Sequence, residues 1–63
     1  MTEQDLRDKN GYLVGRIRTQ YDGVLEVRDK YGVLKGRYDP AKNETRDSNG
    51  NLFARGNMLA ALL

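Results

Sequence analysis

A ten-residue sequence occurs three times in this chain and constrains its fold more than any other feature. The shared frame is R-D-x-x-G-x-L-x-[GA]-R, and six of its positions match almost perfectly between the copies. Agreement this extensive indicates that one structural unit is repeated along the chain. The three copies of the frame cover residues 7–16, 28–37 and 46–55.

Each copy of the frame contains a turn signal of the form Asp-x-x-Gly. An aspartate at the first position of a tight turn can accept hydrogen bonds from backbone N–H groups two or three residues later. A glycine at the fourth position can adopt a positive φ without a clash. A type I turn followed by such a glycine makes a three-residue hairpin loop, so each frame predicts a strand, a turn and a second strand. The predicted turn residues are Asp8 with Gly11, Asp29 with Gly32, and Asp47 with Gly50.

Two further turn signals separate the copies of the frame. One contains Asp22 and Gly23, and the other, at residues 39–43, contains Pro40, which cannot donate a hydrogen bond to a neighbouring strand. Turn signals that recur every nine or ten residues leave room only for short strands. We therefore predict an all-β fold, an antiparallel meander of about six short strands arranged as three repeated hairpins. The first strand is expected from about residue 4, the second to end near residue 19, and the others to cover residues 24–28, 33–38, 42–46 and 51–55.

Alternation of side chains after each frame glycine predicts two different faces for the sheet. The leucine of each frame shares one face with the glycine or alanine two residues later, and the final arginine lies on the other face. A small residue at a fixed place favours the close approach of another backbone or of a bulky neighbour. The predicted leucine face carries Leu13, Leu34 and Leu52, together with Gly15, Gly36 and Ala54.

The C-terminal residues 57–63 depart from the repeat and carry no charged side chain. Asn57 can cap a helix, and the methionine, leucine and alanine residues that follow are good helix formers. Seven residues cannot hold a helix alone in water, so we expect a short helix or apolar tail that needs a surface to dock on. That surface is either the sheet of the same chain or a neighbouring subunit; a disordered tail is the third alternative.

The length of 63 residues predicts a single domain. Its units are residues 6–23, 27–44 and 45–56, followed by the tail at 57–63. A domain this small buries only about 60% of the surface that its unfolded chain exposes, and such domains are usually reinforced by disulfides, a metal or assembly. Cysteine is absent, so assembly is the remaining means, and we predict a homo-oligomer. The predicted interface residues are Leu13, Leu34, Leu52, Met58, Leu59, Leu62 and Leu63.

The composition argues against enzymatic activity, metal binding and membrane insertion. Histidine and cysteine, the commonest general base and thiol nucleophile, are both absent, so we predict no enzyme, no cofactor and no metal site. The repeated Asp-x-x-Gly turns lack the alternate ligands and terminal glutamate of a calcium-binding loop. No stretch has the length of a membrane-spanning helix or the form of a secretory signal, and we expect a cytoplasmic protein of bacterial type.

Arginine recurs at fixed places in the frame, which raises the question of anion binding. Arg16, Arg37 and Arg55 are the predicted contacts for a nucleic acid or a small anion. Tyr12 and Phe53 are predicted on the same strand faces as Arg16 and Arg55, and arginine with interleaved aromatic residues on a sheet often holds single-stranded nucleic acid. Pairing with neighbouring carboxylates is the structural alternative for these arginines. The net charge of +2 adds little to the case for nucleic acid.

The D-x-x-G-x-x-x-G wording of the first two copies resembles the bacterial four-fold beta-flower type of small domain. Asp8, Gly11 and Gly15 carry the resemblance in the first copy, and Ala54 departs from it in the third. The resemblance implies hairpin units assembled around an axis, an oligomer without an assigned activity, and a relation to the small reading frames of integron cassettes. A weaker resemblance, at residues 21–23 and 47–52, is to the YD repeats of large bacterial surface and toxin proteins.

Together these features predict a small structural or interaction protein that acts as a homo-oligomeric β assembly. The alternative is a nucleic-acid- or small-anion-binding module that uses the repeated arginines. A third hypothesis is that the chain is a module of a larger repeat system. Only the similarity to YD repeats supports it.

Overall fold

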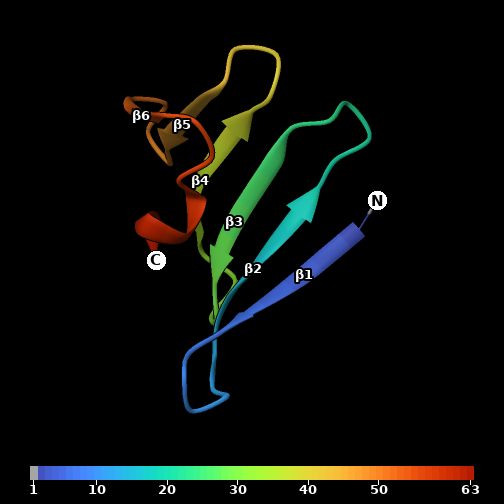
Figure 1. Ribbon diagram of the computed structural model, residues 1–63, viewed down its shortest axis with the longest axis vertical. Coiled ribbons are helices and arrows are strands. Elements are labelled where there is room, and N and C mark those ends of the chain that lie inside the picture. Colours follow the sequence, from blue (N-terminus) through green and yellow to red (C-terminus); the bar gives the residue numbers. More distant parts are fainter. Residues whose placement is uncertain (1) are drawn as a thin grey trace.

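The computed structural model describes residues 2–63 and shows six strands that form one twisted antiparallel sheet (Figure 1). Each strand pairs with the strands that precede and follow it in the sequence, so β1 and β6 form the two edges of the sheet. The predicted all-β meander of six short strands in three hairpins is therefore confirmed. The strands are β1 (Thr2–Arg7), β2 (Leu13–Thr19), β3 (Leu25–Asp29), β4 (Leu34–Asp39), β5 (Glu44–Asp47) and β6 (Leu52–Arg55).

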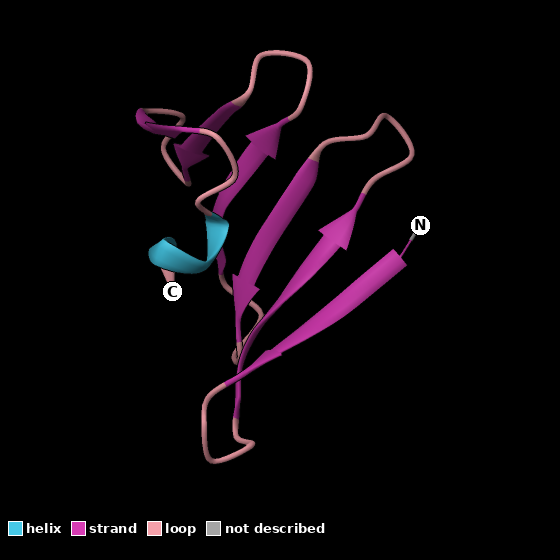
Figure 2. Ribbon diagram, viewed as in Figure 1, coloured by secondary structure: helices cyan, strands magenta, loops and turns pink. Residues whose placement is uncertain are grey.

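One turn of 3-10 helix, η1 (Leu59–Leu62), follows the last strand and lies over one face of the sheet (Figure 2). It is the short C-terminal helix that the sequence predicts, although it is tighter than an α-helix. Met58 occupies the capping position in place of the predicted Asn57. Asn57 still supports the turn, because its Oδ1 accepts a hydrogen bond from the Leu59 amide at 3.3 Å.

The strand boundaries differ from the prediction by one or two residues, for reasons that lie in the turns. Strands β3, β4 and β6 each begin one residue late, because the preceding residue still closes its loop. Its carbonyl accepts a backbone hydrogen bond at 2.9–3.0 Å, as the Val33 carbonyl does from the Asp29 amide. Strand β5 begins at Glu44 because Asn43, with a φ of 53°, still belongs to the turn. Strand β1 begins earlier than expected, at Thr2, which pairs with Thr19.

The three frame turns use the same set of hydrogen bonds. In the first turn, Oδ1 of Asp8 accepts from the amides of Asn10 at 2.8 Å and Tyr12 at 3.0 Å. Gly11 has a φ of 86°, a conformation that costs glycine little, and its amide donates to the Asp8 carbonyl at 3.0 Å. The same aspartate and glycine interactions recur at Asp29 with Gly32 and at Asp47 with Gly50.

The first arginine of each frame closes the turn that follows it. Its Nη1 donates a hydrogen bond of 2.9 Å to the carbonyl of the frame glycine in all three copies. This contact explains why arginine precedes aspartate in the frame. The pairs are Arg7 with Gly11, Arg28 with Gly32, and Arg46 with Gly50.

The turn between β2 and β3 forms where it was predicted, but its aspartate accepts fewer hydrogen bonds than the aspartates of the frame turns. The carboxylate of Asp22 accepts a hydrogen bond from the Val24 amide at 3.0 Å. Gly23 has a φ of 91°, and its amide donates to the Gln20 carbonyl at 2.9 Å. The predicted turn residues Asp22 and Gly23 therefore lie in the turn and shape it.

A register shift at the same place in every hairpin changes which side chains share a face. Leu6 pairs with Gly15, but its neighbour Arg7 pairs with Leu13, so Val14 is an extra residue opposite this step. The second and third hairpins have the same shift, with Lys35 and Phe53 as the extra residues. A β-bulge of this kind interrupts the alternation of side chains. The predicted leucine face is therefore wrong: Leu13, Leu34 and Leu52 each lie opposite an arginine, outside the row of Gly15, Gly36 and Ala54.

The C-terminal tail docks on the sheet of its own chain. Helix η1 packs against β3 and β4. Leu59 of the helix is 1% exposed, and Val27 of β3 is 0% exposed. Among the described residues, these are the only two apolar side chains that are fully buried. The core is thus a single contact zone between the tail and the middle of the sheet.

Thr45 fixes the backbone of the tail against β5. Its hydroxyl is fully buried and donates to the Gly56 carbonyl at 2.6 Å. The same hydroxyl oxygen accepts a hydrogen bond from the Met58 amide at 3.0 Å. One side chain therefore satisfies both backbone groups at the point where the chain leaves β6.

The frame glycines in β2 and β4 make room for leucines of the tail. A Cβ added at Gly15 would lie 2.9 Å from a methyl carbon of Leu63. A Cβ at Gly36 would collide with a methyl group of Leu62 and with the Arg46 carbonyl oxygen. A Cβ at Gly15 would also lie 2.5 Å from the Arg28 carbonyl oxygen. The small residue at this place in the frame therefore permits close approach of both a neighbouring backbone and a bulky side chain, as the sequence predicts, and the side chains belong to the tail.

Replacement of Gly36 by alanine tests this packing. Because the Arg46 carbonyl belongs to a paired strand and cannot move freely, we expect Gly36→Ala to lower the free energy of unfolding by about 1–3 kcal/mol. Urea denaturation followed by circular dichroism measures the change. The third copy of the frame supplies the control, since Ala54→Gly creates no clash and should cost at most about 1 kcal/mol. A neutral Gly36→Ala would contradict the close approach.

Asp29 is held in its charged form by the turn that it caps. The hydrogen bond from the Val33 amide is the largest cause that lowers the pKa of this carboxyl group. The Tyr31 amide and the Lys35 ammonium lower the pKa further, and partial desolvation opposes them. Because folding lowers this pKa, the stabilisation is complete above the unfolded-state pKa, near about 4, and is lost as the pH falls through the folded-state value.

Asp29→Asn removes this titrating group but keeps an oxygen that can accept hydrogen bonds. We expect the original chain to melt at a higher temperature than the variant at about pH 6, because only the carboxylate gains from the charged state. The difference should shrink as the pH falls from about 5 to about 2. Thermal melts across this range measure it, and a difference that stayed constant would contradict the role of Asp29.

Candidate functional site

The face of the sheet opposite η1 carries charged side chains from all six strands. Successive residues of a strand point to opposite faces of the sheet, and along each strand the arginines and carboxylates alternate with residues that face the tail. We call this surface the arginine face. It carries Arg16, Arg18, Arg28, Arg37, Arg46 and Arg55 with Glu3, Asp5, Glu26 and Glu44.

In the first two hairpins, one carboxylate lies between the two arginines of its frame. Asp5 contacts Arg16 across the strands at 3.0 Å and Arg7 along its own strand at 3.5 Å. Glu26 likewise contacts Arg37 at 3.6 Å and Arg28 at 3.5 Å. Two of the three arginines predicted to contact anions, Arg16 and Arg37, are therefore engaged with carboxylates of their own chain.

The third hairpin keeps the same arrangement in its register. Glu44 contacts Arg46 at 3.1 Å and pairs with Arg55 on the neighbouring strand. The acid always stands two residues before the first arginine, so the repeat extends to the form [DE]-x-R-D. This acid was not predicted from the sequence, although its spacing from the Arg-Asp pair is the same in all three copies.

The solvent exposure of the carboxylates differs along the arginine face. The side chain of Glu26 is only 4% exposed and that of Glu44 is 16% exposed, whereas Asp5 is 43% exposed. The arginines around them are about half exposed. Near β3, β4 and β5 the guanidinium groups therefore cover the carboxylates and form the outer layer, while near β1 both signs of charge reach the solvent.

Arginines lie directly opposite each other where one hairpin joins the next. Arg16 pairs with Arg28 at the joint of β2 and β3, and Arg37 pairs with Arg46 at the joint of β4 and β5. Like charges in such a pair repel unless other charges offset them. At the second joint there is also a hollow of about 240 Å³, whose lining residues are Val24, Arg37, Asp39, Lys42, Glu44 and Arg46.

The predicted interface residues differ in how deeply they are buried. Leu59 is buried in the core, and Leu13, Leu34 and Leu62 are half-buried. Leu52, Met58 and Leu63 are exposed. The structure thus assigns part of this set to packing within the chain and leaves the rest near β6 and the end of the tail.

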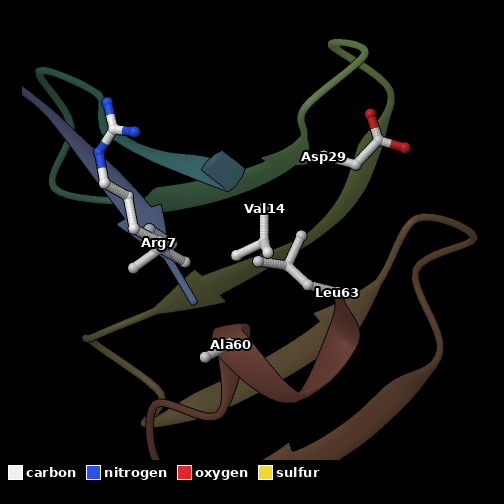
Figure 3. Close-up of a pocket in the computed structure, with 6 residues that line it drawn as sticks. Arg7, Val14, Asp29, Ala60 and Leu63 are labelled. Carbon is white, nitrogen blue, oxygen red and sulfur yellow. The ribbon is translucent and has the colours of Figure 1, made fainter. Parts of the chain in front are cut away.

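A second hollow, of about 410 Å³, lies between the first hairpin and the tail (Figure 3). Val14 and Leu63 face each other within it, and Leu6 and Ala60 complete its apolar lining. Arg7 and Asp29 also line it, but Figure 3 shows their charged ends directed away from the apolar side chains. Both are also engaged elsewhere, Arg7 with its turn and Asp29 with Lys35. This hollow therefore offers apolar contact and no polar group that would orient a small ligand.

Residues 2–63 contain neither a metal-ligand cluster nor a helix that could span a membrane. No group of three or more His, Cys, Asp or Glu side chains in this part of the chain could hold a metal ion. No helix within the same residues has the length and apolar character needed to cross a membrane.

Comparisons with protein-family models, with curated proteins and with solved structures found no match for this chain. The resemblances to beta-flower domains and to YD repeats therefore stay predictions. Two surfaces remain as candidate functional sites: the apolar edge at β6 and the arginine face.

Proposed function

We propose that this protein is a structural or interaction module that works by self-association rather than by catalysis. The observation that carries the proposal is the state of the edge strand β6. Its Leu52 and Phe53 side chains are 48% and 47% exposed, and Met58 of the tail is exposed as well. An edge strand with exposed apolar side chains is a template for pairing with another chain.

The small core supports the same proposal. The folded chain exposes 4472 Å², compared with about 4,100 Å² expected for a compact monomer of its mass. One fully buried leucine and one fully buried valine stabilise the described part of the sheet. Association that covered β6 would add apolar burial, worth about 25 cal/mol for each Å² removed from water.

A second copy of this chain is the partner that the repeat favours. Strand β1 precedes a frame turn as β3 and β5 do, and β6 follows one as β2 and β4 do. Within the chain, a strand that follows one frame turn pairs twice with a strand that precedes the next, in β2–β3 and in β4–β5. The edge strands β6 and β1 are of these same two kinds, so they could pair in the same way between copies. In a head-to-tail assembly, β1 of one copy would pair with β6 of the next, and closure of the rotation would give a ring.

The joint between copies would depend strongly on side chains. Gly56, with a φ of 81°, turns the chain away after Arg55, so β6 offers a ladder of only four residues. Leu52, Phe53 and Met58 would supply the remaining contact area. Leu59, in contrast, belongs to the core of its own chain. This arrangement is in line with an oligomeric beta-flower-type protein of the bacterial cytoplasm, which we keep as part of the proposal.

Phe53→Lys tests the proposed edge. A charge on this strand should oppose pairing with a second copy, and Phe53 is exposed enough for the fold to tolerate the change. We expect the original chain to show a multiple of 7.2 kDa by light scattering after size exclusion, and the variant to show the monomer mass.

Tyr21→Lys is the matched control, because Tyr21 is 96% exposed in the turn between β2 and β3. It replaces an exposed aromatic residue with the same charge, far from the proposed joint in the sequence, and should leave the mass unchanged. An original chain that stayed monomeric over a hundredfold range of concentration would refute self-association. An assembly that survived Phe53→Lys would place the interface elsewhere.

A further inference from the structure

We propose that the hollow at the joint of β4 and β5 binds a small phosphate-type oxyanion, with inorganic phosphate or pyrophosphate as its simplest forms. This site is independent of self-association and lies within one chain. Its cationic groups are Arg37 from β4, Arg46 from β5 and Lys42 from the turn between these strands.

The opposed arginines are the first reason for the assignment. Arg37 and Arg46 occupy facing positions in the register, so their side chains leave the sheet side by side. Arg46 already donates from Nη1 to the Gly50 carbonyl and from Nη2 to Glu44. Arg37 contacts Glu26. A guanidinium has five N–H donors in one plane, so each arginine keeps donors that suit the oxygens of a phosphate group. An anion held between the two would add a charge-assisted contact with each arginine.

The position of the carboxylates is the second reason. Glu26, which contacts Arg37, is almost completely buried, and Glu44, which contacts Arg46, is largely covered. A ligand that approaches from solvent therefore meets guanidinium groups before it meets carboxylates. The joint of β2 and β3 differs, because Arg16 contacts the more exposed Asp5 at 3.0 Å.

Lys42 supplies a third positive charge at the hollow. Within residues 2–63 its ammonium group forms no ion pair, so it is available to a ligand. Asp39, which also lines the hollow, uses its Oδ1 to accept a hydrogen bond from the Ala41 amide at 2.9 Å. Three cations and two carboxylates line the hollow, which leaves one net positive charge to attract an anion.

The surroundings favour a small anion over single-stranded nucleic acid. Proteins that hold single strands stack the bases on aromatic side chains, but no aromatic residue lines this hollow. The nearby Tyr38 pairs with Thr45 in the row that faces the tail, and its hydroxyl donates to Asn43 at 2.8 Å. The hollow therefore offers charge without a stacking platform.

The test is a titration of the whole chain with pyrophosphate at low ionic strength, followed by calorimetry and by the NMR signals of the arginine Nε–H groups. We expect saturable binding in the millimolar range or tighter. Lys42→Ala should weaken it at least fivefold without harm to the fold, because this side chain makes no ion pair there. Arg37→Ala should weaken it at least tenfold.

Two controls separate the site from general attraction to a positive protein. Lys9→Ala removes the same charge from the first frame turn, outside the hollow, and should change the affinity by less than twofold. Phe53→Lys should leave the affinity of the hollow at Arg37, Lys42 and Arg46 for pyrophosphate unchanged even when it is monomeric, because this hollow lies within one chain. This result keeps the anion site distinct from the proposed assembly, so that either proposal can fail alone.

Several results would overturn the anion site. Equal losses in Lys9→Ala and Lys42→Ala would show attraction by net charge alone, and absence of saturation by about 10 mM pyrophosphate would show no site. A dT oligonucleotide that bound more tightly than pyrophosphate, and lost affinity equally in Arg16→Ala and Arg37→Ala, would instead indicate a polyanion surface across the whole arginine face.

Discussion

The fold depends on the contact between the tail and the middle of the sheet. Six short strands with a charged outer face leave only one face that can bury apolar side chains, and η1 is the element that covers it. Leu59 of the tail and Val27 of β3 are the fully buried apolar side chains of the described residues. Leu62 and Leu63 reach the sheet because the frame provides glycine, and no larger residue, at Gly36 and Gly15. The repeat therefore encodes a docking surface for the tail as well as a series of turns.

The turns and strands could be predicted from sequence because their causes are local. An aspartate that accepts two amides and a glycine with a positive φ lie within five residues of each other. The leucine face could not be predicted, since the bulge at Val14 depends on how two strands pair and not on either strand alone. The destination of the tail likewise depends on packing across the whole sheet. The acid at Asp5 was missed for another reason, because it lies outside the frame and alternates with glutamate in the other copies.

The two faces of the sheet contribute differently to the molecule. The tail face is closed by apolar contact and by the two hydrogen bonds of the Thr45 hydroxyl. The arginine face consists mainly of half-exposed ion pairs, and such pairs usually contribute about 0–1 kcal/mol each. Glu26 is the exception, because a nearly buried carboxylate would be costly without Arg28 and Arg37 beside it. Apart from Glu26, the clearest structural contribution of this face is the hydrogen bond from the first arginine of each frame to the carbonyl of its turn glycine.

The repeat also links the two proposed properties. Arg55 stands in its frame where Arg16 and Arg37 stand in theirs, and Arg7 corresponds to Arg28 and Arg46. If β6 of one copy pairs with β1 of the next in the register of the internal joints, Arg55 lies opposite Arg7 of the second copy. Assembly then creates a further arginine pair with the same need for a counter-charge as Arg37 and Arg46. An anion that bridges this pair binds the assembled state better than the separate chains, so by linkage it must favour assembly to the same degree that assembly favours its binding.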